Sequence, residues 1–181
     1  MRSLINTNMY AKNFPKKRYK HTLKFLKTYI NPGESILDLG VKNPFSEILK
    51  TEGFEVTNTL GEDLDINTTG LDLSTAEVTT AFEIFEHLLS PFTVLKSIQS
   101  KKLVASIPLR LWFARAYRSK TDPRDRHFHE FESWQFDWLL EKAGWKIIAT
   151  EKWTNPTKKI GLRPILRWFT PRYYIVYAER I

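Results

Sequence analysis

The sequence predicts an α/β fold in which a mostly parallel sheet is covered by helices on both faces. Residues 35–40 are an apolar run that ends in an acid and a glycine, as a buried strand followed by a ligand loop does. Residues 103–107 are continuously apolar, which is typical of a central parallel strand. Helical and strand-like patterns alternate along the chain, and this order indicates βαβ units.

The first half of the chain predicts two helices and two strands in alternation. A helix is expected over 21–30, where apolar side chains recur at i, i+3 and i+7, and Pro32-Gly33 ends it. Strand one follows at 35–40. A second helix has its apolar face at Phe45, Ile48 and Leu49 and closes at Gly53. Residues 54–59 alternate and are β-rich, so they are expected to form strand two.

The second half predicts strands separated by longer connections. A short third strand is expected near 63–67 and a fourth at 77–82. Ser90-Pro91 predicts a helix start, and residues 103–107 form the fifth strand. A long loop over 109–130 precedes a helix that Ser133 caps and Gly144 ends. The last two strands are expected at 145–150 and 173–178.

Composition favours a single domain and excludes several classes of protein. The chain has 181 residues, of which 42% are hydrophobic, so it can bury a sizeable core. It has no cysteine, which excludes disulfides and thiolate zinc sites. We expect a basic N-terminal segment and helix over 1–32, a core over 33–153, and a basic-aromatic segment with the final strand over 154–181. Because no signal-peptide pattern and no apolar stretch of ~20 residues occurs, we expect a cytoplasmic protein.

Two segments together carry a family resemblance. Ser35-Ile36-Leu37-Asp38-Leu39-Gly40 ends in an acid and a glycine, and Glu77 to Leu88 contains Phe82-Glu83 and then Glu86-His87-Leu88. This pair resembles the Rossmann-like class I methyltransferases that use S-adenosylmethionine, in particular their small type 11-like domains. The resemblance extends from about Gly33 to Trp153. It implies methyl transfer from S-adenosylmethionine and a seven-stranded sheet with late antiparallel strands.

The resemblance also implies the cofactor-binding residues. Asp38 would balance the amino group of the methionyl end, and Leu39-Gly40 would let the loop backbone approach the cofactor. Phe82 and Glu83 would contact its adenosine and methionyl parts. Where relatives carry further glycines, this chain has Val41-Lys42-Asn43-Pro44, so Lys42 would lie near the methionyl carboxylate.

The second strand lacks the acid that family members use for the ribose diol. Asn58 stands near that place and can still hydrogen-bond a hydroxyl. Asp63 and Asp65 are alternatives for the ribose or the adenine amino group. An ordinary solvated turn explains the same two residues equally well.

The segment 126–131 follows the fifth strand, where related enzymes place substrate-facing residues. His127 and His129 are the candidate catalytic bases, since a base helps when the acceptor carries a proton. We favour a structural role for His87. The His-x-His spacing also suits a metal, but with no cysteine and only Glu130 nearby we expect no metal site.

Charge suggests the kind of acceptor. The formal net charge is +8, and the basic residues gather in the N-terminal segment, the 109–130 loop and the C-terminal segment. We expect an O or N acceptor on a small or lipid-linked anionic molecule, and peripheral contact with an anionic membrane through 109–118 and 160–169. The alternative is a non-catalytic, regulatory module that binds nucleic acid or anionic membrane. Nucleic acid is the weaker expectation, because no base-binding motif is present.

Overall fold

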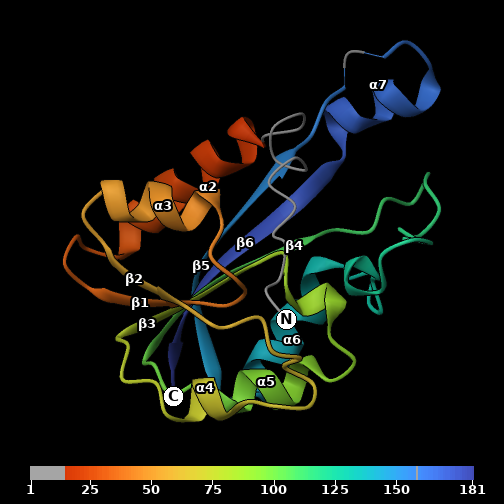
Figure 1. Cartoon of the computed structure of the whole chain (residues 1–181). Coiled ribbons are helices and arrows are strands. Elements are labelled where there is room, and N and C mark those ends of the chain that lie inside the picture. The colour runs from red at the N-terminus through yellow and green to blue at the C-terminus, as the bar shows by residue number, and fades with distance from the viewer. Residues whose placement is uncertain (1–14, 158) are drawn as a thin grey trace.

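The computed structural model describes residues 15–157 and 159–181 (Figure 1). Its first half contains α2 (Lys16–Tyr29), β1 (Ser35–Asp38), α3 (Pro44–Thr51), β2 (Glu55–Asn58), α4 (Thr69–Asp72), β3 (Val78–Phe82) and η1 (Phe85–His87). Its second half contains α5 (Pro91–Ser97), β4 (Lys102–Pro108), η2 (Pro123–Asp125), α6 (Ser133–Lys142), β5 (Trp145–Thr154), α7 (Leu162–Phe169) and β6 (Pro171–Arg180).

The strands form one six-stranded sheet in the order β2-β1-β3-β4-β6-β5. The four strands from β2 to β4 are parallel, whereas β6 runs antiparallel to both of its neighbours. The chain moves outward from β1 to β2 and then returns to the other side of β1 as β3. Ligands bind at such a reversal of strand order, at the carboxyl ends of the strands.

Helices cover both faces of the sheet, which confirms the predicted fold class. In Figure 1, α2 and α3 lie on one face, and α4, α5 and α6 lie on the other. Successive residues of β1 point to opposite faces of the sheet and pack under different helix layers, because side chains alternate along a strand. Ile36 packs with Phe25 and Leu26 in one core cluster, and Leu37 packs with Leu95 and Leu103 in the other.

The predicted third strand does not form. Residues 64–66 make turns, and only Leu64 among them is buried, while Ile66 is exposed. The Asp65 carboxylate accepts from the backbone N–H groups of Leu89 and Ser90, both at 2.8 Å, so the segment is held at the start of α5. Within the described residues the sheet therefore has six strands rather than seven, and β2 is one of its two edges.

Two helix starts also differ from expectation. The first helix begins at Lys16 rather than near His21, and Tyr19 in the added turns packs its ring 4.8 Å from that of Phe45. The helix α6 is capped by Glu132 in a capping box with Gln135, and the Ser133 hydroxyl, expected to be the cap, accepts from Lys152 Nζ at 2.7 Å. Among the described residues, no helix combines the length and the apolar character needed to cross a membrane.

Candidate active site

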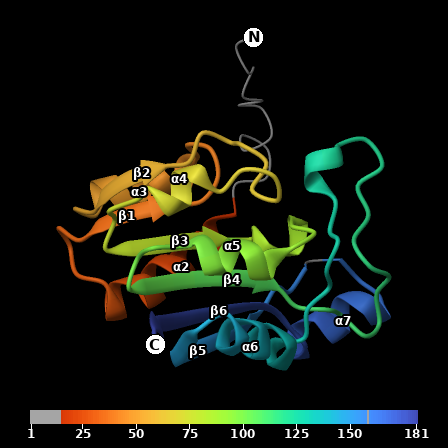
Figure 2. The ribbon, with the colours of Figure 1, turned by 90° about the horizontal axis from the view of Figure 1, so that it is seen from below.

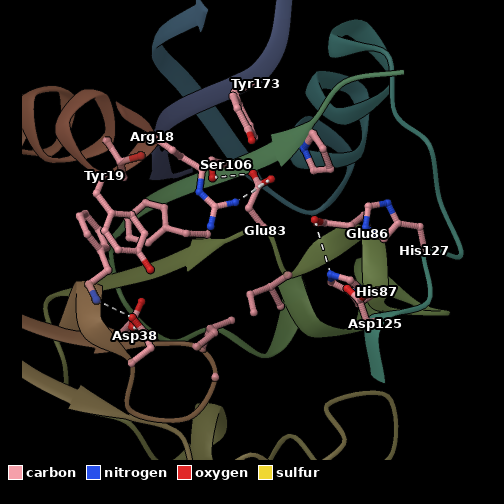
Figure 3. A pocket seen from close by; sticks show the side chains of 18 of the residues that line it. Arg18, Tyr19, Asp38, Glu83, Glu86, His87, Ser106, Asp125, His127 and Tyr173 are labelled. Atoms are coloured by element: carbon pink, nitrogen blue, oxygen red, sulfur yellow. Dashed lines mark hydrogen bonds and ion pairs between the residues drawn. The ribbon is translucent and has the colours of Figure 1, made fainter. Parts of the chain in front are cut away.

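A cavity of about 480 Å³ lies at the carboxyl ends of β1, β3 and β4 (Figure 3). Its floor comes from the loop after β1 (38–41), the segment after β3 (82–84), and Ser106 with Pro108 of β4. Its walls come from α2, from η1, from the 109–130 loop and from the start of β6. Its size is within the range of ~300–1,000 Å³ of small-molecule sites.

Asp38 is the centre of a hydrogen-bond network beneath this cavity. It is 2% exposed, and its carboxylate accepts four side-chain hydrogen bonds. Oδ1 accepts from Thr80 at 2.7 Å; Oδ2 accepts from Asn58 at 2.9 Å, Ser46 at 3.0 Å and Asn43 at 3.3 Å. Burial raises the pKa of Asp38, and the donated hydrogen bonds act in the opposite direction. Asp38 thus joins β1, β2, β3 and the start of α3 at the switch point.

The loop after Asp38 leaves the cavity open. Gly40 has φ +105°, a conformation that favours glycine, and its N–H donates to Thr59 Oγ1 at 2.8 Å. Asn43 caps α3 through the N–H groups of Phe45 and Ser46. Lys42 points away and pairs with Glu47 at 3.0 Å, so it does not line the cavity.

Glu83 faces the same cavity from the end of β3. It is the only non-glycine with positive φ (58°) among the described residues, and its N–H donates to the Ser106 carbonyl at 2.9 Å. Its carboxylate accepts from Ser106 Oγ at 3.1 Å and lies 3.3 Å from Arg18 Nη1 (Figure 3). Burial raises the pKa of Glu83, and Arg18 is the largest of the influences that oppose this rise. An uncommon backbone conformation held in this way is frequent at functional sites.

We expect Arg18→Met to destabilise the protein by about 1–2 kcal/mol at neutral pH, between the values for exposed and fully buried pairs, because it removes the cation of a pair that is 27% exposed at Arg18 and 14% at Glu83. Loss of Arg18 raises the pKa of Glu83 further. The native state then holds a proton more tightly than the unfolded chain, so stability falls as pH rises. Urea unfolding of wild type and Arg18→Met at neutral pH and at pH ~4 measures this. The loss of stability should be smaller at pH ~4, near the ordinary pKa of glutamate.

The control is Lys27→Met on the same helix, whose pair with Glu52 is exposed. We expect a change below ~0.5 kcal/mol at either pH. Equal deficits in the two variants, or a deficit of Arg18→Met that is independent of pH, would contradict the role given to Arg18.

The far side of the cavity gathers Glu86, His87 and His127. The backbone N–H groups of Phe128 and His129 donate to the Glu86 carbonyl at 2.8 and 3.2 Å, which holds the returning limb of the 109–130 loop against η1. The ring of His127 therefore lies 4.7 Å from that of His87. Burial, with a smaller effect of His87, lowers the pKa of His127 to about 4. His127 is thus neutral at pH 7 and a weak proton acceptor.

The structure brings most of the predicted site residues together. Those that line the cavity are Asp38, Leu39, Gly40, Phe82, Glu83 and His127. Three others are not among the lining residues. Asn58 uses its amide to hold Asp38, Asp63 lies in an exposed turn, and the Nε2 atom of His129 lies 3.4 Å from the Leu89 carbonyl oxygen.

Sequence reasoning missed the residues that reach the cavity from distant segments. These are Arg18 and Tyr19 of α2, Ser106 of β4, Tyr117 and Asp125 of the long loop, and Arg172 and Tyr173 of β6. Arg18 belongs to a basic run that gave no reason to single it out. Glu86 was visible beside His87, but its burial at 1% exposure was not.

This sheet order and site position define the fold of the class I S-adenosylmethionine-dependent methyltransferases. No family model and no curated protein matches the chain. Solved structures do. A SAM-dependent methyltransferase from Archaeoglobus fulgidus is 16% identical with a TM-score of 0.64, over 91% of this chain and 94% of that one.

Two further structures share the fold. Magnesium protoporphyrin IX methyltransferase from Synechocystis PCC 6803, solved with bound SAM, is 12% identical with a TM-score of 0.60, over 92% of this chain and 79% of that one. The [4+2]-cyclase SpnF is 11% identical with a TM-score of 0.57, over 91% and 82%. Because this fold also occurs in a cyclase, the reaction must be argued from the site.

Proposed function

We propose that the protein binds S-adenosylmethionine and transfers its methyl group to an O or N acceptor on an anionic molecule. One observation carries the proposal: the cavity at the switch point adjoins a second, basic cavity. The second cavity measures about 510 Å³ and shares Tyr117 and His127 with the first. Arg118, Lys120 and Arg126 line it, and its lining includes no acid.

The first cavity suits the cofactor. The glycine corner at Gly40 admits close approach of a ligand to the backbone, and Glu83 offers a carboxylate to the cationic methionyl end. Phe82 offers an apolar face beside them. One structural neighbour, the Synechocystis enzyme, was solved with bound SAM.

The second cavity suits the acceptor. The three cations that line it favour a phosphate or carboxylate group. Because the two cavities meet at Tyr117 and His127, an anionic acceptor held in one would present a nucleophilic atom to the methyl group held in the other.

Calorimetric titration with S-adenosylmethionine and S-adenosylhomocysteine tests the proposal. We expect saturable heat for both, with dissociation constants in the micromolar range typical of substrates. Absence of heat at about 1 mM of either ligand, well above a micromolar constant, would overturn it.

The helix α7 supports a membrane-associated acceptor. None of its residues is buried, and it projects beyond the sheet in Figure 1. Leu162, Ile165, Trp168 and Phe169 are all more than half exposed, while Arg163 and Arg167 supply positive charge. An exposed apolar face with cations beside it favours the surface of an anionic membrane. Figure 2 shows α7 at the same end of the molecule as the 109–130 loop, which carries the basic cavity.

We expect the double variant Trp168→Ser/Phe169→Ser to weaken binding to phosphatidylglycerol vesicles at least tenfold, since each large apolar side chain contributes about 1.5–3 kcal/mol when buried. Vesicle sedimentation at low and high salt measures it, and wild-type binding should fall with salt. Trp138→Ser is the control, because Trp138 is 65% exposed on α6. Equal loss in both variants would contradict a role for α7. Vesicle binding without any cofactor binding would instead support the non-catalytic alternative.

A further inference from the structure

Three side chains of types that can ligate a metal converge in the wall of the first cavity, beside its junction with the second at His127. Glu86, His87 and His127 each offer one ligand atom, and these atoms all lie within 4.8 Å of one another. All three residues line the first cavity, and Figure 3 shows Glu86 and His127 facing His87 across its wall. They come from two segments of the chain, η1 and the 109–130 loop, which the hydrogen bonds to the Glu86 carbonyl join.

The Glu86 carboxylate contacts His87, whose Nε2 lies 3.7 Å from Oε1, and forms no ion pair with a lysine or arginine among the described residues. Its side chain is 1% exposed, and its Oε2 atom has no hydrogen-bond partner among the described residues. Arg18 pairs with Glu83, and the charge of Glu83 acts unfavourably on Glu86. A buried carboxylate beside another carboxylate is costly unless a cation or donor compensates it. Among the described residues no donor or cation contacts Oε2, so this oxygen is available to a metal ion.

His87 is oriented as a metal ligand. Its Nδ1 lies 3.0 Å from the Arg126 carbonyl oxygen, which can only accept, so Nδ1 carries the proton. The other ring nitrogen, Nε2, lies 3.7 Å from Glu86 Oε1 and is the atom that could ligate a metal ion. A ligating histidine usually donates its other N–H to a carbonyl or carboxylate in this way.

We propose that Glu86, His87 and His127 bind a divalent first-row transition-metal ion such as Zn²⁺, Mn²⁺ or Co²⁺. Two imidazoles and one carboxylate are a common set for these ions, whereas Mg²⁺ and Ca²⁺ prefer oxygen ligands. Metal–ligand bonds of about 2.0–2.2 Å place ligand atoms roughly 3–3.5 Å apart, so the three ligand atoms, which lie within 4.8 Å of one another, must draw closer to hold an ion. This replaces our expectation of no metal, which considered His127 and His129 as the pair.

The consequence for chemistry rests on the proposed function. Three protein ligands leave coordination positions for water or for an acceptor oxygen. An acceptor hydroxyl bound there loses its proton to water more readily. Its oxygen then forms the bond to the methyl carbon as the sulfur–methyl bond breaks, and the neutral thioether leaves. The favoured acceptor is thus a hydroxyl group on an anionic molecule, and His127 acts as a ligand rather than as the base.

Co²⁺ binding to the full chain tests the site without reference to activity. We expect one equivalent of Co²⁺ to bind in calorimetry and to develop a visible absorption band, while Mg²⁺ gives no comparable binding. Glu86→Gln and His127→Ala should each weaken Co²⁺ binding at least tenfold, since even loss of a residue that only orients a ligand typically costs about 10–100-fold in metal affinity. Thermal unfolding checks that both variants fold.

His129→Ala is the matched control, since His129 is close in sequence but does not line the cavity. It should bind Co²⁺ as the wild type does. Failure of one equivalent of Co²⁺ to bind, or equal weakening in His129→Ala and His127→Ala, would overturn the metal site. Titration of S-adenosylhomocysteine into the same samples separates this outcome from failure of the proposed function, because cofactor binding uses the opposite side of the cavity.

Discussion

Replacing Gly40 with leucine is expected to weaken binding of S-adenosylmethionine at least about 100-fold, equivalent to ~2.7 kcal/mol. A Cβ at this position would meet Ile84 Cδ1 at 3.6 Å, an ordinary contact, so the remainder of the side chain must occupy the cavity. The backbone at φ +105° adds a stability cost of about 1–2 kcal/mol. Calorimetric titration and urea unfolding measure the two effects separately.

Gly33→Leu is the control for Gly40→Leu, because it strains the backbone without placing a side chain in the cavity. Gly33 has φ +91°, and a Cβ built there meets nothing within 4 Å. It lies before β1, away from the cavity, so the variant should lose a similar amount of stability and retain cofactor affinity. If Gly40→Leu still binds the cofactor normally, the loop after β1 is not where the cofactor lies.

Replacing Asp38 with alanine is expected to destabilise the protein by about 3–5 kcal/mol. The substitution leaves the donors of Thr80, Ser46, Asn58 and Asn43 without their shared acceptor at a buried point where three strands and α3 meet. These losses are coupled, so they do not simply add. Urea unfolding of wild type and variant at pH 7 measures the difference.

Asp63→Ala is the corresponding control for an aspartate in an exposed turn. Among the described residues its carboxylate accepts a hydrogen bond from the Asp65 N–H, so we expect a loss of about 0.5–1 kcal/mol. A loss for Asp38→Ala no greater than this would show that the network is not a source of stability. Retained cofactor affinity in a folded Asp38→Ala protein would limit Asp38 to a structural role.

Local signals were sufficient for the layered fold. The strand residues 35–38 alternate between two cores, and the Pro44 and Pro91 helix starts follow from local chemistry. The predicted strand near 63–67 was wrong because Asp65 binds the backbone of Leu89 and Ser90 instead of extending. Asp65 lies 24 and 25 residues before these partners, so no local sequence pattern predicts the interaction.

The candidate site also has a part that the sequence predicted and a part that it did not. The corner at 38–40 and the segment 82–87 could be predicted because each is contiguous, and each follows a buried strand whose end marks the ligand edge of a parallel sheet. Asn58 and His129 occupy positions in the sequence that suit site residues. However, the Asn58 side chain hydrogen-bonds Asp38, and the His129 ring lies against the Leu89 carbonyl oxygen. Spacing predicts which residues are near the edge, but not where each side chain points.

The sequence by itself determined the alternation of strands and helices, the glycine corner after β1 and the excess of positive charge, because these depend on neighbouring residues and composition. Only the tertiary structure decided that Arg18 pairs with Glu83, and that His127 lies beside Glu86 and His87. Those contacts join residues 40 to 65 positions apart. They form only when sheet order and loop closure bring separate segments to one edge, and no local pattern specifies that closure.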